Sequence, residues 1–267
     1  MLRFVPLIAV VSLLVGPAWT GAVEPVVEPA VETRWDQALR AKDMAAVDRL
    51  LDEGADPART AAGQRTALMF ASEHGDPAIV DKLLAAGANV NARNQYNGTA
   101  LMFAAKGGSV AVAGRLIDEG ADVNAVADLG WTALLVSSAK GNVELSLLLI
   151  NRGADVNARD KNGWTPLMHA VADRHPETVN ALLGIDSVDP NLREESGSTA
   201  LHMAAMTGDV DVARALIARG ADASARTSRG YSPAQVAREA KHAELAHLLE
   251  AAAPGRERQK TGDLDSP

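Results

Sequence analysis

The 267-residue sequence predicts an all-α solenoid of about seven stacked helix-turn-helix units. Two markers recur in phase about every 33 residues: a Thr-Ala-Leu or Thr-Pro-Leu step from Thr66 onward, and a Gly-Ala-Asp or Gly-Ala-Asn step from Gly54 onward. The composition agrees, because 47% apolar but only 3% aromatic residues suit small Ala- and Leu-built units better than one large core.

The first segment, residues 1–22, has the pattern of a secretory signal peptide. Arg3 precedes an apolar run over 4–15, which is short of the roughly 20 residues that a membrane-spanning helix needs. We expect cleavage after Ala22, with Ala18 as the second site. The chain has no Cys, so neither a disulfide nor a lipid-bearing cysteine is available. The sequence therefore predicts an exported protein, periplasmic in a bacterium first and secreted second, and an uncleaved membrane anchor is the competing interpretation.

Two further segments flank the repeats. Residues 23–32 repeat a Glu-Pro step, which disfavours a helix and predicts an extended linker. Residues 254–267 alternate charges with Gly and Pro around a single apolar residue and predict a disordered tail. The repeat domain between them spans 33–253, with units that start near residues 33, 66, 99, 132, 165, 199 and 232.

Each unit begins with a helix that the sequence caps. The Thr of the opening step is a good N-cap, and Pro166 and Pro233 stand at the first helical position, where a missing N–H costs nothing. A glycine follows nine residues after the cap, where a positive φ can end the helix. These glycines are Gly75, Gly108, Gly141 and Gly208.

A second helix follows each of these glycines. Apolar residues at helical spacing define one stripe for burial, and the Gly-Ala-Asp step after it predicts a left-handed helix stop. One such pair cannot bury its own stripe, so the pairs must stack. The residues that stand where the second helix needs its N-cap are Asp76, Ser109, Asn142 and Asp209.

With these features in place, the sequence resembles the ankyrin repeat family over about 33–253. Thr165-Pro166-Leu167-Met168 and Thr199-Ala200-Leu201-His202 each match the family's Thr-Pro-Leu-His opening at three of its four positions. The resemblance implies units made of a β-turn finger and two antiparallel helices, a local structural hydrogen bond for His202, and a monomer. It also implies that finger residues and the ends of the first helices line a concave protein-binding groove.

Two units depart from the pattern. The unit at 165–198 has Arg174 in place of the turn glycine, His175 in place of the next cap, and one extra residue before its end. A hinge and tolerated drift are both open interpretations. In the last unit Glu250 and Gln235 replace residues that are mostly apolar elsewhere, as a terminal unit with a polar outer face requires.

The sequence carries no recognisable catalytic motif, since phosphate-binding glycine loops and the nucleophile elbow are absent. His242 and His247 lie about 140° apart around a helix, so they cannot share a metal on one face. A net charge of −8 argues against nucleic acid as the partner. We therefore expect no enzyme activity, no cofactor and no metal, with a site around His169, Asp173 and His175 as the enzymatic alternative.

Residues that the repeat itself does not use predict the binding surface. Trp131 and Trp164 hold the same place in adjacent units and predict a row of aromatic rings along the groove, which Tyr96 and Tyr231 extend. The competing interpretation is that each Trp packs on its own finger. The further candidates are Arg65, which holds the same place as the tryptophans in an earlier unit, the finger residues Arg93, Arg159, Lys161, Arg193 and Arg226, and the helix ends Glu73, His74, Lys106, Lys140 and Met206.

An aromatic centre with a basic rim suits an acidic, carboxylate-bearing segment of another protein. Finger charges that are solvated and bind nothing are the alternative for the rim. We predict a non-catalytic scaffold that binds, stabilises or inhibits another exported protein through this groove. The alternative function is a membrane-tethered structural protein of the cell envelope, held by an uncleaved N-terminal anchor.

Overall fold

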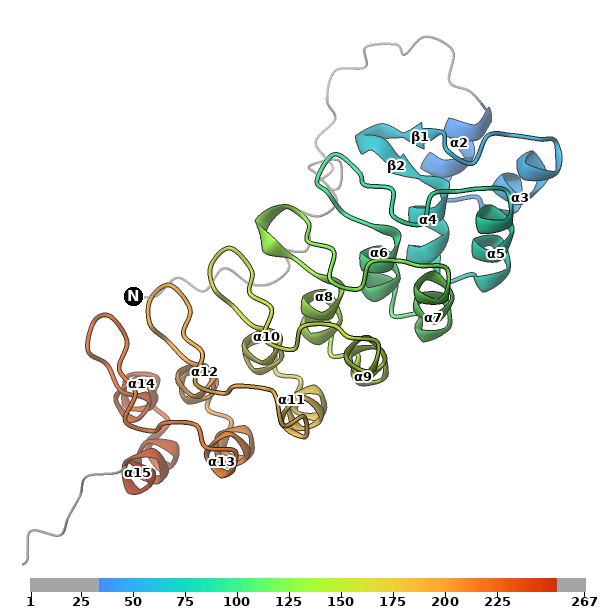
Figure 1. Cartoon of the computed structure of the whole chain (residues 1–267). Helices are drawn as coiled ribbons and strands as arrows, with labels where there is room; N and C mark the ends of the chain where they lie inside the picture. Colours follow the sequence, from blue (N-terminus) through green and yellow to red (C-terminus); the bar gives the residue numbers. More distant parts are fainter. Residues whose placement is uncertain (1–33, 254–267) are drawn as a thin grey trace, which may run out of the picture.

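The computed structural model describes residues 34–253, which form one row of seven helix pairs (Figure 1). The predicted signal peptide, linker and tail lie outside the described residues. Within the described range the all-α repeat fold is confirmed. None of the helices in this range is long and apolar enough to cross a membrane.

The pairs follow one another along the chain with short connections. They are α2 (Arg34–Ala41) with α3 (Met44–Asp52), α4 (Ala67–His74) with α5 (Pro77–Ala85), α6 (Ala100–Gly107) with α7 (Val110–Asp118), α8 (Ala133–Ala139) with α9 (Val143–Asn151), α10 (Pro166–Ala172) with α11 (Pro176–Leu183), α12 (Ala200–Thr207) with α13 (Val210–Ala218), and α14 (Pro233–Glu239) with α15 (Ala243–Ala252). One finger also holds two short antiparallel strands, β1 (Thr60–Ala61) and β2 (Arg65–Thr66), and short 3-10 turns occur at Ala62–Gln64 and Asp128–Gly130.

Most of the predicted caps are present, but the Thr99 hydroxyl makes no capping hydrogen bond. The hydroxyl of Thr132 accepts a hydrogen bond from the N–H of Leu135 at 3.3 Å, and Thr66 and Thr165 act in the same way on their own helices. The four turn glycines take φ between +72° and +81°, and Asp76, Ser109, Asn142 and Asp209 cap the second helices. The local sequence therefore determines where each helix begins and ends.

The helices form two rows, and the loops between pairs project to one side as fingers (Figure 1). An Asn in four of the fingers ties its unit to the next one. The Asn91 side chain donates to the Gly120 carbonyl at 2.9 Å and accepts from the Asp122 N–H at 2.9 Å. Asn124, Asn157 and Asn191 make the same pair of bonds one unit further on. These bonds satisfy backbone groups that would otherwise be left open at each helix end.

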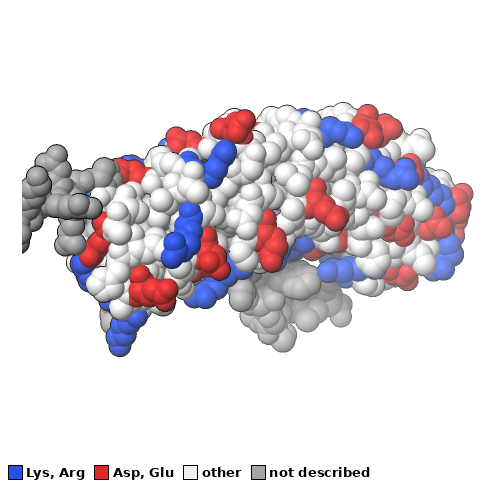
Figure 2. Space-filling model, turned by 90° about the horizontal axis from the view of Figure 1, so that it is seen from below, with Lys and Arg blue, Asp and Glu red and all other residues white. Residues whose placement is uncertain are grey.

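The second helices are joined by ion pairs between units. Lys82 contacts Asp48 at 2.6 Å, Arg115 contacts Asp81 at 2.5 Å, and Arg152 and Arg219 repeat the arrangement with Asp118 and Asp186. Figure 2 shows the side of the stack away from the finger tips, where Lys and Arg are interspersed with Asp and Glu. Each exposed pair adds only about 0.2 to 1 kcal/mol, so this face is charge-balanced rather than strongly stabilising.

The buried apolar core falls into two clusters that meet between the fourth and fifth units. One spans residues 35–154 and the other 156–249, and the half-buried Ile150 packs against both. Near this junction several polar side chains are buried, including Ser138 and Thr178, whose hydroxyls have no hydrogen-bond partner. Buried polar groups without partners weaken packing, so this interface is expected to be the least stable in the stack.

The irregular fifth unit keeps the helix pair by other means. Arg174 takes a φ of +62° where the other units have glycine, and the His175 ring is hydrogen-bonded to the Ala139 carbonyl of the preceding unit at 3.1 Å. The last unit makes the same substitution, since Lys241 has a φ of +67° and His242 bonds to a preceding carbonyl at 3.2 Å. The two units therefore share one variant turn.

The terminal units are closed as a cap requires. In the last unit the Glu250 carboxylate pairs with Arg238, and Gln235 forms a reciprocal capping box with Ser232. In the first unit Trp35 is 2% exposed and packs in the core.

Candidate protein-binding surface

A pocket of about 360 Å³ lies near the C-terminal end of the stack and spans three consecutive units. We call it the C-terminal pocket. It is bounded by the tips of two fingers, by the residue that ends a third finger, and by the ends of α12 and α14. Its lining residues are Trp164, Glu194, Ser196, Ser198, His202, Met203, Met206, Thr227, Ser228, Arg229, Tyr231, Val236, Glu239 and Ala240.

Two aromatic side chains line this pocket: Trp164, which lies before α10, and Tyr231, which lies before α14. Trp164 is half-buried, while Tyr231 is 37% exposed. The difference follows from position, because the unit of Tyr231 is the last one within residues 34–253 and no finger in this range covers it. The small residue at the equivalent place between them, Ser198, leaves the space that forms the pocket.

Beneath these rings the pocket is apolar and braced by a histidine. Met203 is 3% exposed, and Met206 and Val236 are half-buried. His202 Nδ1 accepts from the Thr199 N–H at 3.2 Å, and Nε2 donates to the Tyr231 carbonyl at 3.1 Å. Burial lowers the pKa of His202, although the bond to that carbonyl opposes the shift, so the ring is neutral at pH 7. The predicted structural role of His202 is confirmed.

The charges at the pocket are mainly acidic. Glu194 accepts from the N–H groups of Ser196 at 3.0 Å and Ser198 at 2.9 Å, which hold its carboxylate in its own finger turn. Glu239, at the end of α14, is exposed and forms no ion pair within residues 34–253. Arg229 is the single basic residue of the lining.

Family models described as ankyrin repeats match residues 36–127, 115–194 and 182–237, which together cover most of the chain. The chain belongs to the ankyrin repeat family. The ankyrin repeat domain of human ASB11 superposes with a TM-score of 0.73 at 22% identity, covering 82% of this chain and 98% of that one, which shows the shared fold.

Two curated relatives of this ankyrin repeat protein match shorter stretches. The tyrosine-protein kinase HTK16 of Hydra vulgaris is 43% identical over 83 residues, or 30% of this chain and 11% of the kinase. Regulatory protein NPR4 of Arabidopsis thaliana is 39% identical over 70 residues, or 26% of this chain and 12% of that protein. The chain thus matches about a tenth of the length of each relative.

The prediction that Trp131 belongs to an exposed row of aromatic rings is wrong. Trp131 is 1% exposed, and its ring centroid lies 4.7 Å from that of His169. The ring centroid of Trp164 lies 5.1 Å from that of His169. The imidazole thus lies near both tryptophans, and Trp131 packs in the core.

Three of the predicted binding residues contact one another instead of forming a free surface. Glu73 is held by Arg65 at 2.5 Å and by Lys106 at 2.8 Å, and the Arg65 guanidinium lies over the Phe70 and Phe103 rings at 4.0 and 4.3 Å. Burial alone would raise the pKa of Glu73, but the bonds from Lys106 and Arg65 outweigh it and hold the pKa below its ordinary value. The prediction that Arg65 offers its side chain to a partner is wrong, because that side chain is 7% exposed.

The predicted basic rim is exposed, but its arginines bind neighbouring backbone. Arg93 donates to the Val126 carbonyl at 2.8 Å, and Arg193 donates to the Arg226 carbonyl at 2.7 Å. Arg159 likewise donates to the Arg193 carbonyl, and Arg226 donates to Gly230 of its own finger at 2.8 Å. The guanidinium groups of Arg93, Arg159 and Arg193 thus join neighbouring fingers, which sequence reasoning did not predict.

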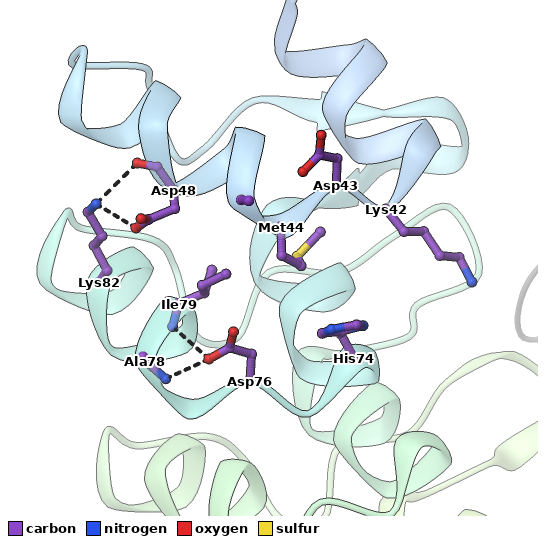
Figure 3. A pocket seen from close by; sticks show the side chains of 10 residues that line it. Lys42, Asp43, Met44, Asp48, His74, Asp76, Ala78, Ile79 and Lys82 are labelled. Carbon is purple, nitrogen blue, oxygen red and sulfur yellow. Dashed lines mark hydrogen bonds and ion pairs between the residues drawn. The ribbon is translucent and has the colours of Figure 1, made fainter.

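The remaining predicted residues lie apart from the C-terminal pocket, except Met206. Lys140 and Lys161 are exposed, Tyr96 is half-buried, and His74 is exposed at the end of α4. His74 borders a depression between the first two units, drawn in Figure 3. The acids there are already in use: Asp43 and Asp76 cap helices and Asp48 pairs with Lys82, so they offer little to a ligand.

The enzymatic alternative around His169, Asp173 and His175 finds no converging geometry. His169 Nε2 faces the Asp160 carboxylate at 3.2 Å, while His175 faces the Ala139 carbonyl. Burial raises the pKa of Asp173, with His169 and His175 opposing the shift. Within the described part of the chain, no group of three or more His, Asp or Glu residues is placed to hold a metal ion.

Sequence reasoning missed several pocket residues, above all Glu239. This residue follows Met206 by one 33-residue period, so the position that marked Met206 as a candidate marks Glu239 too. The prediction of a polar terminal cap accounted for the charged residues on the helices of the last unit, so Glu239 was not considered as a binding residue. Glu194 and Met203 carried no signal of their own, because finger and helix residues of those types are common on any repeat surface.

Proposed function

We propose that this ankyrin repeat protein is a non-catalytic scaffold that binds another exported protein through the C-terminal pocket and the fingers around it. The observation that supports the proposal is a preformed, largely apolar pocket between Trp164 and Tyr231. Aromatic anchors in such pockets are the residues that most often dominate binding energy. The finger and cap hydrogen bonds keep the surface rigid, so little entropy is lost on association.

The sign of charge on the partner is a separate question. The basic rim predicted an acidic segment, and that stays a prediction for the finger edge, where the arginines keep their charge while fastening the fingers. At the pocket itself the carboxylates of Glu194 and Glu239 outnumber the one basic group, Arg229. An acidic segment is therefore disfavoured in the pocket.

Capture from an extract of exported proteins tests the binding function. The chain from Val23 onward is compared with Trp164→Ala and Tyr231→Ala, and with Tyr96→Ala as a control that removes a finger aromatic outside the pocket. We expect one partner to be retained by the parent chain and the control and lost with the two pocket variants, with melting curves recorded to show that each variant remains folded. A partner retained by all four would move the site away from the pocket.

Export is tested by N-terminal sequencing of the protein from its native cells. A mature chain that begins at Val23 supports the exported scaffold. A chain that keeps Met1 and sediments with membranes would instead support the envelope-tethered alternative.

A further inference from the structure

We propose that the C-terminal pocket takes a lysine or arginine side chain, which the protein partner presents from an extended segment. This inference rests on the proposed binding function and adds the chemistry of the group that is recognised. It follows from the combination of aromatic walls, an apolar base and acidic groups in one pocket.

The apolar part of the pocket matches the stem of a long basic side chain. Trp164, Tyr231 and the half-buried Met206 surround a volume of about 360 Å³, enough to cover a chain of three or four methylene groups. The faces of Trp and Tyr rings attract a cation within about 6 Å of their centroids. Both parts of a lysine or arginine side chain therefore find suitable contacts here.

The charged part of the pocket favours a cation over an anion. Glu239 is exposed and has no ion pair among the described residues, so its carboxylate is available to a partner. Two backbone N–H groups fix the Glu194 carboxylate beside the pocket. His202 below the rings is neutral and adds no positive charge. Arg229 is exposed on a finger.

Two carboxylates against one guanidinium give the residues that line the pocket a net negative formal charge. A buried or half-buried carboxylate of a partner would be repelled there, whereas an ammonium or guanidinium group would pair with Glu239. A purely apolar side chain would fill the base but leave Glu239 unpaired. The complementarity therefore points to a basic residue.

The experiment selects a random twelve-residue peptide library on the full chain from Val23, and then measures Kd for the leading synthetic peptides by calorimetry. We expect one Lys or Arg to be fixed among the selected peptides. Replacing it with norleucine, which keeps the stem and removes the charge, should weaken binding about fivefold to tenfold, and added salt should weaken the parent peptide more than its norleucine form.

Variants of the protein assign the effect to the pocket. Glu239→Gln should weaken the basic peptide about fivefold and leave the norleucine peptide unchanged, while Glu244→Gln, an exposed glutamate on α15 outside the lining, should change neither. Trp164→Ala should weaken both peptides, with its melting curve recorded to show that the stack remains folded.

The outcomes separate this inference from the proposed function. The selected peptides could lose affinity with Trp164→Ala and yet carry a fixed acidic or apolar residue. That result would overturn the proposed recognition of a basic side chain and keep the pocket as a binding site. Peptides whose affinity is insensitive to Trp164→Ala would overturn both.

The chain itself contains a competing source of basic side chains in Arg256, Arg258 and Lys260, which follow α15 in sequence. The triple variant with serine at these positions is measured with the same peptide. We expect an unchanged Kd. A gain in affinity of more than tenfold would show that the chain's own tail competes for the pocket, and would overturn the assignment to a partner.

Discussion

Trp131 packs its indole against the imidazole of His169, with ring centroids 4.7 Å apart and an angle of 44° between the planes. His169 in turn bonds to Asp160 at 3.2 Å, and both of these polar side chains are buried. The contact lies where the two apolar clusters of the core meet. Trp131 therefore links the fourth and fifth units, and its neighbour in the repeat, Trp164, is left to line the pocket.

Trp131→Ala should destabilise the protein far more than Trp164→Ala. The first variant removes a side chain that is 1% exposed and leaves a cavity, so we expect a loss of about 3 to 5 kcal/mol in the free energy of unfolding. The second removes a half-buried ring and should cost less than half of that. Urea denaturation at pH 7 measures both. Equal, small losses would contradict the core position of Trp131.

Glu73→Gln should destabilise the second and third units, because Arg65 and Lys106 would lose the carboxylate between them. Their side chains are 7% and 19% exposed, so we expect about 2 kcal/mol, below the roughly 3 to 5 kcal/mol of a fully buried pair. Glu119→Gln, an exposed glutamate after α7, is the matched control and should change the free energy of unfolding by less than about 0.5 kcal/mol.

The same carboxylate makes stability depend on acid. The pKa of Glu73 is lower in the folded chain than its ordinary value of 4.5, so the unfolded chain binds the proton first as the pH falls. Its contribution is fully present above about pH 4.5 and is lost below it. The difference in free energy of unfolding between parent and Glu73→Gln should shrink as the pH falls below 4.5. A constant difference would show that the bonds to Arg65 and Lys106 do not affect this titration.

His202 should make the protein less stable in mild acid. Its pKa is lowered in the fold from an ordinary 6.5, so its contribution is complete above pH 6.5 and is lost as the pH falls below that value. His202→Gln keeps an acceptor for the Thr199 N–H, as Gln235 does for Ser232 in the last unit. This variant should make the melting temperature less dependent on pH between 6.5 and 5. His74→Gln, at an exposed position, should leave the dependence unchanged.

Gly208→Ala and Gly220→Ala should differ in cost although both residues have a positive φ, +79° and +84°. A Cβ at Gly220 meets nothing within 4 Å, so we expect only the backbone strain of about 1 to 2 kcal/mol. A Cβ at Gly208 would overlap the His242 ring, which bonds to the Met206 carbonyl, and this bond should be lost as well. Equal melting temperatures for the two variants would show that the ring moves aside without cost.

The junction between the fourth and fifth units should be the first part of the stack to open. Thr178 is fully buried and its hydroxyl has no partner, so Thr178→Val should stabilise the protein by about 1 kcal/mol. Amide hydrogen exchange then decides between a hinge and drift in the irregular unit. Faster exchange in α10 and α11 than in the neighbouring pairs, slowed by Thr178→Val, favours the hinge, and uniform protection would exclude it.

The repeat architecture was predictable because it is local and redundant. Thr132, Asn142 and Gly141 each act within a few residues of themselves, as caps and as a turn with positive φ. Their recurrence at one period identifies the units even where one marker is missing, as at Arg174. The resemblance to ankyrin repeats implied a local hydrogen bond for His202, and its partner Thr199 is indeed three residues away.

Which residues face solvent was decided by tertiary structure. Trp131, Trp164 and Tyr231 occupy one position of the repeat and have the same local surroundings, yet only Tyr231 and Trp164 reach the pocket. The reason is that exposure at this position depends on the unit that stacks next: His169 packs on Trp131, the small Ser198 leaves Trp164 partly open, and no further unit covers Tyr231 within the described residues. The sequence by itself determined the units, their caps and their number, while the stacking of unlike side chains across neighbouring units determined where a partner can bind.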